Sequence, residues 1–131
     1  MNEIQNNQWI AHYRTDQPNF GLERMVELLT LRGNPHLKLK VIHIGGTNGK
    51  GSTITFLKNM LEKMGLKVGV FSSPYLIHYT DQISINGKSI PEARLEAMMA
   101  DYESLLEGEK GLALQGTTEF EIITALAYDY F

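Results

Sequence analysis

The 131-residue sequence has no cysteine, which excludes disulfide bonds and thiolate chemistry. It has no apolar run near the roughly 18 residues of a membrane-spanning helix, and residues 1–7 lack the basic and apolar segments of a secretory signal. Its 12 basic residues do not outnumber its 15 acidic ones, and the net charge of −3 gives no general attraction to nucleic acid or to an anionic membrane. We therefore predict a cytoplasmic protein with no nucleic-acid or membrane partner, in which any anion site is local.

The spacing of apolar residues predicts a single α/β domain, which the length of 131 residues and the 43% hydrophobic content also favour. Helical periodicity covers residues 2–13, 22–31, 54–64, 92–106 and 118–131. The short apolar runs 41–44 and 67–71 are typical of buried parallel strands, and with the helix between them they form a βαβ unit. Asn86-Gly87, which follows the alternating residues 82–85, predicts a small β-hairpin. The predicted fold is therefore a partial P-loop-type parallel sheet with flanking helices and a hairpin.

A glycine-rich segment at residues 45–53, Gly-Gly-Thr-Asn-Gly-Lys-Gly-Ser-Thr, lies between the first apolar run and the helix that follows. Glycines let a backbone approach an anion closely, and the N–H groups at the start of a helix then face that anion. Lys50 adds a mobile positive charge, and Ser52 or Thr53 can offer a hydroxyl group to a magnesium ion. We therefore predict a phosphate site made of Thr47, Asn48, Gly49, Lys50, Gly51, Ser52 and Thr53.

This segment departs from the common P-loop pattern G-x-x-x-x-G-K-[ST]. Ile44 stands where that pattern has its first glycine, and Gly51 stands where it has serine or threonine. The alternative interpretation is a glycine-rich turn that binds nothing. We favour the phosphate site, because a buried turn has no use for a lysine that is flanked by two glycines.

Three further segments stand in order with the glycine-rich one: residues 20–25 (Phe-Gly-Leu-Glu-Arg-Met), 71–76 (Phe-Ser-Ser-Pro-Tyr-Leu) and 118–121 (Thr-Glu-Phe-Glu). Together the four segments resemble the folylpolyglutamate synthases, the folate branch of the Mur ligases, and the resemblance extends over about residues 8–131. Peptidoglycan Mur ligases usually have threonine after the loop lysine, whereas Gly51 is similar to the folate branch.

The resemblance implies an ATP-dependent amide ligase that also needs Mg²⁺. In that reaction ATP phosphorylates the terminal carboxylate of a folate, either tetrahydrofolate or dihydropteroate, and the amine of L-glutamate attacks the acyl phosphate. The resemblance assigns Lys50, as the catalytic residue, and the loop amides to the β- and γ-phosphates, and it assigns Ser73 and Glu121 by motif to the magnesium ion. A serine oxygen, a carboxylate, phosphate oxygens and waters make the oxygen shell that Mg²⁺ prefers.

The resemblance also implies that residues 1–131 are the N-terminal portion of an ATP-binding domain, and that the glutamate-binding C-terminal domain is absent. The last helical pattern runs to Phe131 without a stop signal, and two parallel strands make a poor core. We therefore expect the chain to be inactive alone. We also expect it to expose apolar surface and, through that surface, to self-associate.

Several of these assignments have alternatives. Thr118-x-x-Glu121 is the spacing of a capping box, in which Glu121 would bond to the start of its own helix. Ser73 could simply end a strand before Pro74. Gln82 stands where the family usually has arginine, so an anion contact carried over to that position is in doubt. For the whole chain, the other interpretations are a different P-loop phosphotransferase and a non-catalytic nucleotide-binding module.

Overall fold

The structure, a computed structural model, describes residues 8–15, 19–73 and 77–131. The chain forms two compact units. Met1–Leu39 and Glu92–Phe131 together form the helical unit, and Lys40–Pro91 forms the sheet unit. Length and composition do not indicate this division, because the helical unit is made of two segments separated by the whole sheet unit.

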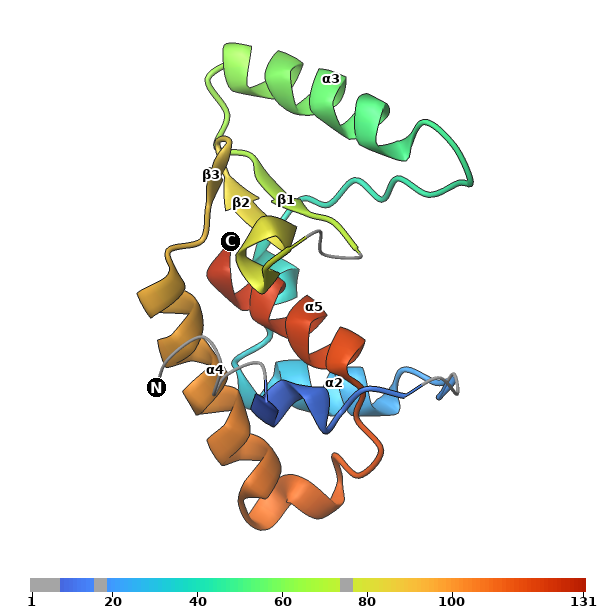
Figure 1. Ribbon diagram of the computed structural model, residues 1–131, viewed down its shortest axis with the longest axis vertical. Coiled ribbons are helices and arrows are strands. Elements are labelled where there is room, and N and C mark those ends of the chain that lie inside the picture. The colour runs from blue at the N-terminus through green and yellow to red at the C-terminus, as the bar shows by residue number, and fades with distance from the viewer. Residues whose placement is uncertain (1–7, 16–18, 74–76) are drawn as a thin grey trace. The chain divides into compact units, whose positions relative to one another are not determined.

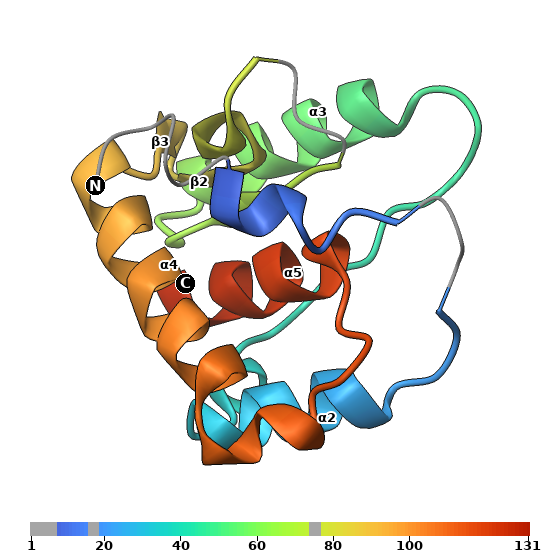
Figure 2. The same cartoon turned by 60° about the horizontal axis from the view of Figure 1, so that its bottom comes forward.

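Among the described residues, three long helices build the helical unit: α2 (Glu23–Leu31), α4 (Glu92–Glu107) and α5 (Glu119–Tyr130). Two short 3-10 helices, η1 (Pro35–Lys38) and η3 (Glu109–Leu112), follow α2 and α4, and residues 8–11 are helical. α5 packs against α2, α4 and η1 (Figures 1 and 2). The apolar side chains that these helices bury are Leu28, Leu29, Leu95, Met98, Met99, Tyr102, Ile122, Ile123, Ala125, Leu126 and Ala127. Within the described ranges, no helix has both the length and the apolar character needed to cross a bilayer.

The predicted end of the helix at α2 is confirmed. Gly33 and Asn34 have φ angles of 82° and 54°, in the left-handed region that glycine and asparagine adopt most readily. The Asn34 N–H donates to the Leu29 carbonyl at 2.8 Å, and Pro35 begins η1. Local signals in the sequence are therefore sufficient to end this helix.

A polar cluster joins the three helices of the helical unit. The Arg32 guanidinium lies 2.7 Å from the Asp129 carboxylate and 5.3 Å from the centroid of the Tyr102 ring. The Tyr102 hydroxyl donates to the same carboxylate at 3.4 Å, and burial raises the pKa of Tyr102 well above its usual value. The cluster thus links the end of α2 to α5 through an ion pair and to α4 through the ring and hydroxyl of Tyr102.

The sheet unit contains α3 (Lys50–Lys63), η2 (Tyr79–Gln82) and the strands β1 (Gly69–Phe71), β2 (Ile83–Ile85) and β3 (Lys88–Ser89). The strands form an antiparallel sheet in the order β1-β2-β3, and Phe71 pairs with Ile83. The predicted hairpin is confirmed, because Asn86 and Gly87 form its turn with φ angles of 48° and 77°. Positive φ at both central positions is the conformation that favours Asn-Gly between two strands.

The parallel sheet that the sequence predicts does not appear among the described residues. Val41–Ile44 belongs to no helix or strand, and Val41 and Ile42 are 58% and 62% exposed. The predicted strand 67–71 appears as the shorter β1, whose partner β2 is antiparallel. A continuous apolar run predicts burial on both faces, but it does not specify which strand will lie beside it. Here the nearby hairpin supplies the neighbour of β1, and the broader prediction of an α/β chain is correct.

Helix α3 is only partly covered by the rest of the chain. None of its residues, all of which are described, is buried. The helical spacing of Ile54, Leu57, Leu61 and Met64 predicts one apolar face; the first three side chains are half-buried, whereas Met64 is 74% exposed. Beside that face, Phe56 (69%) and Met60 (60%) are also largely exposed. This helix therefore carries an apolar surface that the described residues of the chain leave open to solvent.

Candidate functional site

The glycine-rich loop of the sheet unit turns sharply into α3. Gly46 and Gly49 have φ angles of 142° and 79°, a region that residues with a side chain rarely adopt. Gly49 is the N-cap residue of α3, and its carbonyl accepts a helical hydrogen bond from the Thr53 N–H at 3.0 Å. These two glycines therefore provide the tight turn into the helix that the sequence predicts.

The loop is open beside the start of α3. Among the described residues, an added Cβ at Gly46, Gly49 or Gly51 would meet no atom of another part of the chain within 4 Å. No described side chain caps α3, so the N–H groups of its first turn lack the side-chain acceptor that usually satisfies one of them. Residues 45–53 are all exposed. The loop thus offers backbone donors, the positive end of a helix dipole and space for an anion.

Lys50 is the first residue of α3, and its ammonium group donates a hydrogen bond to the Gly46 carbonyl. The side chain therefore folds back over the loop whose N–H groups are open. A phosphate group bound there would give the ammonium a charged partner in place of a carbonyl, which is a stronger hydrogen bond. Ser52 and Thr53 stand in the same helical turn with their hydroxyl groups. These residues fit the phosphates of a nucleotide together with a hard divalent cation, although their roles stay predictions.

Ser73 lies in the sheet unit, two residues beyond the end of β1, and is exposed. The Ser72 N–H donates to the Gln82 carbonyl at 3.0 Å, which continues the pairing of β1 with β2 up to the neighbour of Ser73. Pro74, which the sequence predicts to restrict the backbone of Ser73, lies outside the described residues. The backbone thus places this serine directly after a paired strand.

Gln82, which replaces the arginine of the family pattern, is buried with 6% of its surface exposed. Its Oε1 atom has no hydrogen-bond partner among the described residues. The preceding Asp81 accepts hydrogen bonds from the His78 N–H at 2.9 Å and the Ile77 N–H at 3.0 Å. These two backbone donors lower the pKa of Asp81 below its ordinary value. Position 82 therefore holds an uncharged, enclosed amide rather than an exposed cation.

Glu121 lies in the first turn of α5, in the helical unit, and forms the predicted capping box with Thr118. The Thr118 N–H donates to Glu121 Oε2 at 2.8 Å, and the Glu121 N–H donates to the Thr118 hydroxyl at 3.3 Å. Arg24 donates to both carboxylate oxygens, from Nη2 to Oε1 at 3.0 Å and from Nε to Oε2 at 3.3 Å. The capping alternative is thus confirmed, and the metal role of Glu121 stays a prediction.

No pattern in the sequence indicates Arg24 as the partner of Glu121. Both residues belong to segments that carry the family resemblance, but they stand 97 positions apart in the chain. The two predicted magnesium ligands fall in different units, Ser73 in the sheet unit and Glu121 in the helical unit. In the part of the chain that the structure describes, no three histidine, aspartate or glutamate side chains are grouped so that they could hold a metal ion.

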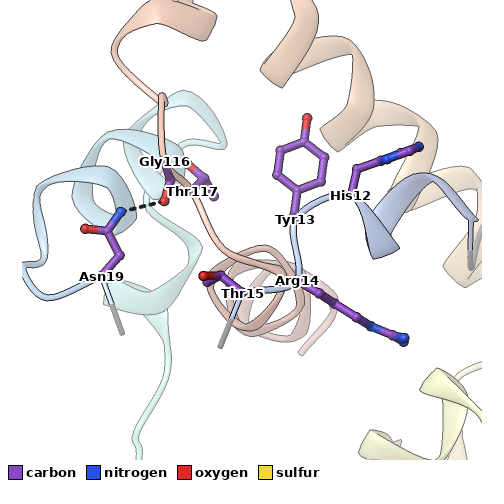
Figure 3. A pocket seen from close by; sticks show the side chains of 7 residues that line it. All are labelled: His12, Tyr13, Arg14, Thr15, Asn19, Gly116 and Thr117. Atoms are coloured by element: carbon purple, nitrogen blue, oxygen red, sulfur yellow. Dashed lines mark hydrogen bonds between the residues drawn. The ribbon is translucent and has the colours of Figure 1, made fainter. Parts of the chain in front are cut away.

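A pocket of about 450 Å³ lies in the helical unit, where two regions about 100 residues apart in the sequence meet (Figure 3). Its lining residues are His12, Tyr13, Arg14, Thr15, Asn19, Gly116 and Thr117. The Asn19 amide donates to the Gly116 carbonyl at 2.8 Å across the pocket wall. Arg14 bonds Glu119 at 2.7 Å, and the Glu119 N–H donates to the Tyr13 carbonyl at 2.9 Å. The lining is polar and spread along the chain, so no local pattern in the sequence indicates this pocket.

The loop, the helix start and the α/β fold define the class of protein: an α/β protein with a glycine-rich, lysine-bearing loop suited to binding phosphate. Comparison with known proteins gives the particular family. No protein-family model matches the chain. The chain is 43% identical over 111 residues to the dihydrofolate synthetase of Saccharomyces cerevisiae, covering 85% of this chain and 25% of that protein. It is 40% identical over 111 residues to the dihydrofolate synthase/folylpolyglutamate synthase of Bacillus subtilis, covering 85% of this chain and 26% of that protein.

Solved structures agree with these sequence matches. The folylpolyglutamate synthetase of Lactobacillus casei superimposes with a TM-score of 0.88 at 36% identity, covering 100% of this chain and 33% of that one. A folylpolyglutamate synthase complex with AMPPCP and folate gives a TM-score of 0.89 at 36% identity, covering 100% of this chain and 32% of that one. The chain is therefore related in sequence and in fold to the folylpolyglutamate synthases, as its motifs predict. It spans about a quarter to a third of the length of these relatives.

Proposed function

We propose that this chain is part of an ATP-dependent ligase that adds L-glutamate to a folate. The terminal carboxylate of the folate accepts the γ-phosphoryl group, and the amine of L-glutamate then displaces phosphate from the acyl phosphate, so that an amide forms. The observation that carries this proposal is the open glycine-rich loop with Lys50 folded over it. The chain that holds this loop is related to a dihydrofolate synthase/folylpolyglutamate synthase. Phosphoryl transfer depends mainly on positioning and charge neutralisation, which such a loop supplies.

Each predicted residue has a part in this proposal. Lys50 neutralises the β- and γ-phosphates, and the amides from Thr47 to Gly51 hold the same oxygens. Ser52 and Thr53 offer hydroxyl groups from the first turn of α3, and Ser73 offers one from the end of β1. Mg²⁺, when bound, would neutralise part of the negative charge of the phosphates. Glu121 is the second proposed ligand of that ion, and its carboxylate also accepts hydrogen bonds from Arg24 and Thr118.

Three further properties belong to the proposal. The chain is the N-terminal portion of an ATP-binding domain and is inactive alone, because the glutamate-binding domain of the family pattern lies elsewhere. Val41–Ile44 is a strand of a parallel sheet in the whole enzyme, which would bury the exposed Val41 and Ile42. The enzyme acts in the cytoplasm, and the 131-residue chain by itself self-associates through its exposed apolar surface.

Release of ADP by the full-length enzyme tests the activity when folate and L-glutamate are each omitted in turn. We expect release to require both substrates for sustained turnover. Release that ignores both substrates would instead favour a different P-loop phosphotransferase, and nucleotide binding without any release would favour a non-catalytic module.

The role of Lys50 is tested by Lys50→Ala, with Lys63→Ala, at the other end of α3, as the matched control. We expect Lys50→Ala to weaken AMPPCP binding by about 10- to 150-fold, because a hydrogen bond to a charged group contributes about 1.5–3 kcal/mol. Lys63→Ala should leave that affinity unchanged. Equal affinities of both variants, measured by titration calorimetry, would contradict the phosphate role of the loop.

A further inference from the structure

Helices α2 and α5 of the helical unit pack against each other and run in the same direction (Figures 1 and 2). An ion pair joins them near each end. Arg24 donates to Glu121 Oε1 at 3.0 Å near the start of both helices, and Arg32 lies 2.7 Å from the Asp129 carboxylate near the end of both. The partners are 97 positions apart in each pair, so the second pair repeats the alignment of the first further along both helices.

Two of these four charges are poorly placed for their own helix. The start of a helix favours negative charge, and its end favours positive charge. Arg24 stands in the first turn of α2 and Asp129 in the last turn of α5, so each opposes the dipole of its own helix. Because the helices are parallel, their like ends also lie side by side. The stabilising partner of each of these two charges is therefore on the other helix.

The apolar contacts between the two helices do not fix how far one is shifted along the other. α2 buries two leucines, and α5 buries apolar side chains in two successive turns between Ile122 and Ala127. A helix with such a repeat presents similar side chains after a shift of one turn, which is about four residues. That shift would bring Ala125 opposite Arg24 in one direction and opposite Arg32 in the other. Each shifted alignment therefore gives an arginine an alanine in place of its carboxylate.

We propose that the two ion pairs set the register of α2 against α5, so that one parallel alignment is stable and alignments shifted by a helical turn are not. The first pair is the more enclosed, since Arg24 and Glu121 are each 12% exposed, against 26% and 17% for Arg32 and Asp129. A partly enclosed charge that loses its partner is costly, so a shifted alignment is penalised at both ends. Specifying one alignment is the best-attested use of buried polar or charged residues between packed helices.

The register also determines how the segments before the two helices meet. Arg24 Nη2 donates to the Asn19 carbonyl at 2.7 Å, and the Asn19 amide donates to the Gly116 carbonyl at 2.8 Å. Asn19 and Gly116 both line the pocket of Figure 3, so a shift of α5 would separate its wall. Among the described residues, Glu121 Oε1 accepts a hydrogen bond only from Arg24, so the pairing leaves room for the metal role proposed for this carboxylate.

Two variants of the 131-residue protein separate a unique alignment from stability. The apolar variant replaces both pairs, through Arg24→Met, Glu121→Leu, Arg32→Met and Asp129→Leu. Apolar replacement of an enclosed ion pair is often neutral or stabilising, so we expect the helical circular dichroism to remain. The reversed variant, Arg24→Glu with Glu121→Arg, exchanges the charges of the first pair. It loses the capping box of α5 and should therefore unfold at a lower urea concentration than the unmodified protein.

Paramagnetic broadening of amide signals measures the register. Because the chain has no cysteine, Val26→Cys provides a single site for a nitroxide label on α2, where Val26 is 59% exposed. The broadening along α5 should be centred on the same residue in the unmodified and the reversed proteins. In the apolar variant the centre should move or spread by about four residues, with at least about a tenth of the molecules in a shifted alignment.

The control variant, Arg14→Gln with Glu119→Gln, removes a pair that is more exposed, at 49% and 18%, and that does not involve α2. It should leave the broadening profile unchanged. A single, unmoved alignment in the apolar variant would overturn the proposal, because apolar packing alone would then specify the register. A shifted profile in the reversed variant would contradict it as well. Loss of helical circular dichroism in the apolar variant would also overturn it, since the proposal requires that apolar contacts hold the helices together without the pairs.

Discussion

Gly51 stands in the first turn of α3, where an alanine would fit. Among the described residues, nothing outside its own neighbourhood lies within 4 Å of an added Cβ, and Gly51 is not among the glycines with positive φ. Glycine in a helix is less favourable than alanine by about 0.5–1 kcal/mol. Gly51→Ala should therefore raise the free energy of unfolding by about that amount in urea titrations.

The same substitution should weaken AMPPCP binding in the full-length enzyme, because a methyl group would occupy space in which we place the phosphate. Gly51→Ala would then increase stability and decrease nucleotide affinity. This combination indicates that the glycine serves ligand binding rather than the stability of the fold. A more stable Gly51→Ala variant with unchanged affinity would show that the phosphate does not approach this position.

At the residue scale, the sequence predicts the roles of residues that act together with their neighbours in the chain, and it does not predict contacts between distant residues. The turn glycines and Lys50 are predictable, because a loop that joins an extended segment to a helix is built from consecutive residues. The ion pair of Arg24 with Glu121 is not predictable, because its members are 97 positions apart and each has a local explanation of its own. The burial of Gln82 is also not predictable, because the alternation of residues 82–85 does not specify which face of the strand is covered.

At the element scale, η2 depends on Asp81. Its carboxylate accepts the backbone N–H groups of His78 and Ile77, and these bonds lower the pKa of Asp81. A lowered pKa in the folded state means that the charged form contributes stability above the ordinary carboxyl value of about 3.9. That contribution is lost as the pH falls through the lowered pKa of the folded protein.

We therefore expect Asp81→Asn to unfold at a lower temperature than the unmodified protein at pH 7, because asparagine keeps a carbonyl acceptor but not the charge. The difference between the two melting temperatures should shrink when the pH is lowered below about 3.9. Thermal unfolding followed by circular dichroism from neutral to acidic pH measures both. A difference that stays constant over this range would mean that the charge of Asp81 has no part in stabilising η2.

Elements whose signals are local are the ones that the sequence predicts correctly. Asn86-Gly87 makes its hairpin, Gly33-Asn34 ends α2, and Thr118 with Glu121 caps α5. The run 41–44 has the right composition for a buried strand, yet a strand also needs a neighbour, and its pairing depends on residues far along the chain. Parallel pairing of this run does not appear among the described residues, in which the neighbour of β1 is the hairpin strand β2.

At the scale of the whole molecule, burial is uneven between the two units. α5 of the helical unit buries Ile122, Ile123 and Leu126 almost completely, whereas no residue of α3 in the sheet unit is buried. Large exposed apolar surfaces are uncommon on monomeric proteins and mark places where another surface docks. The sheet unit is therefore where the 131-residue chain differs most from a self-sufficient domain.

The outer face of α3, made of Phe56, Met60 and Met64, should drive association of the isolated 131-residue protein. These side chains are each at least 60% exposed and follow one another at helical spacing of four residues. We expect light scattering to give a mass above that of one chain, rising with concentration. Met60→Lys should lower that mass, because a charged group in the middle of the face is costly to bury.

Leu112→Lys is the control, since Leu112 is 80% exposed but lies in η3 of the helical unit, away from this helix in sequence and in unit. A monomer at every concentration, or an equal loss of mass in both variants, would show that this face does not associate and that its exposure has another cause.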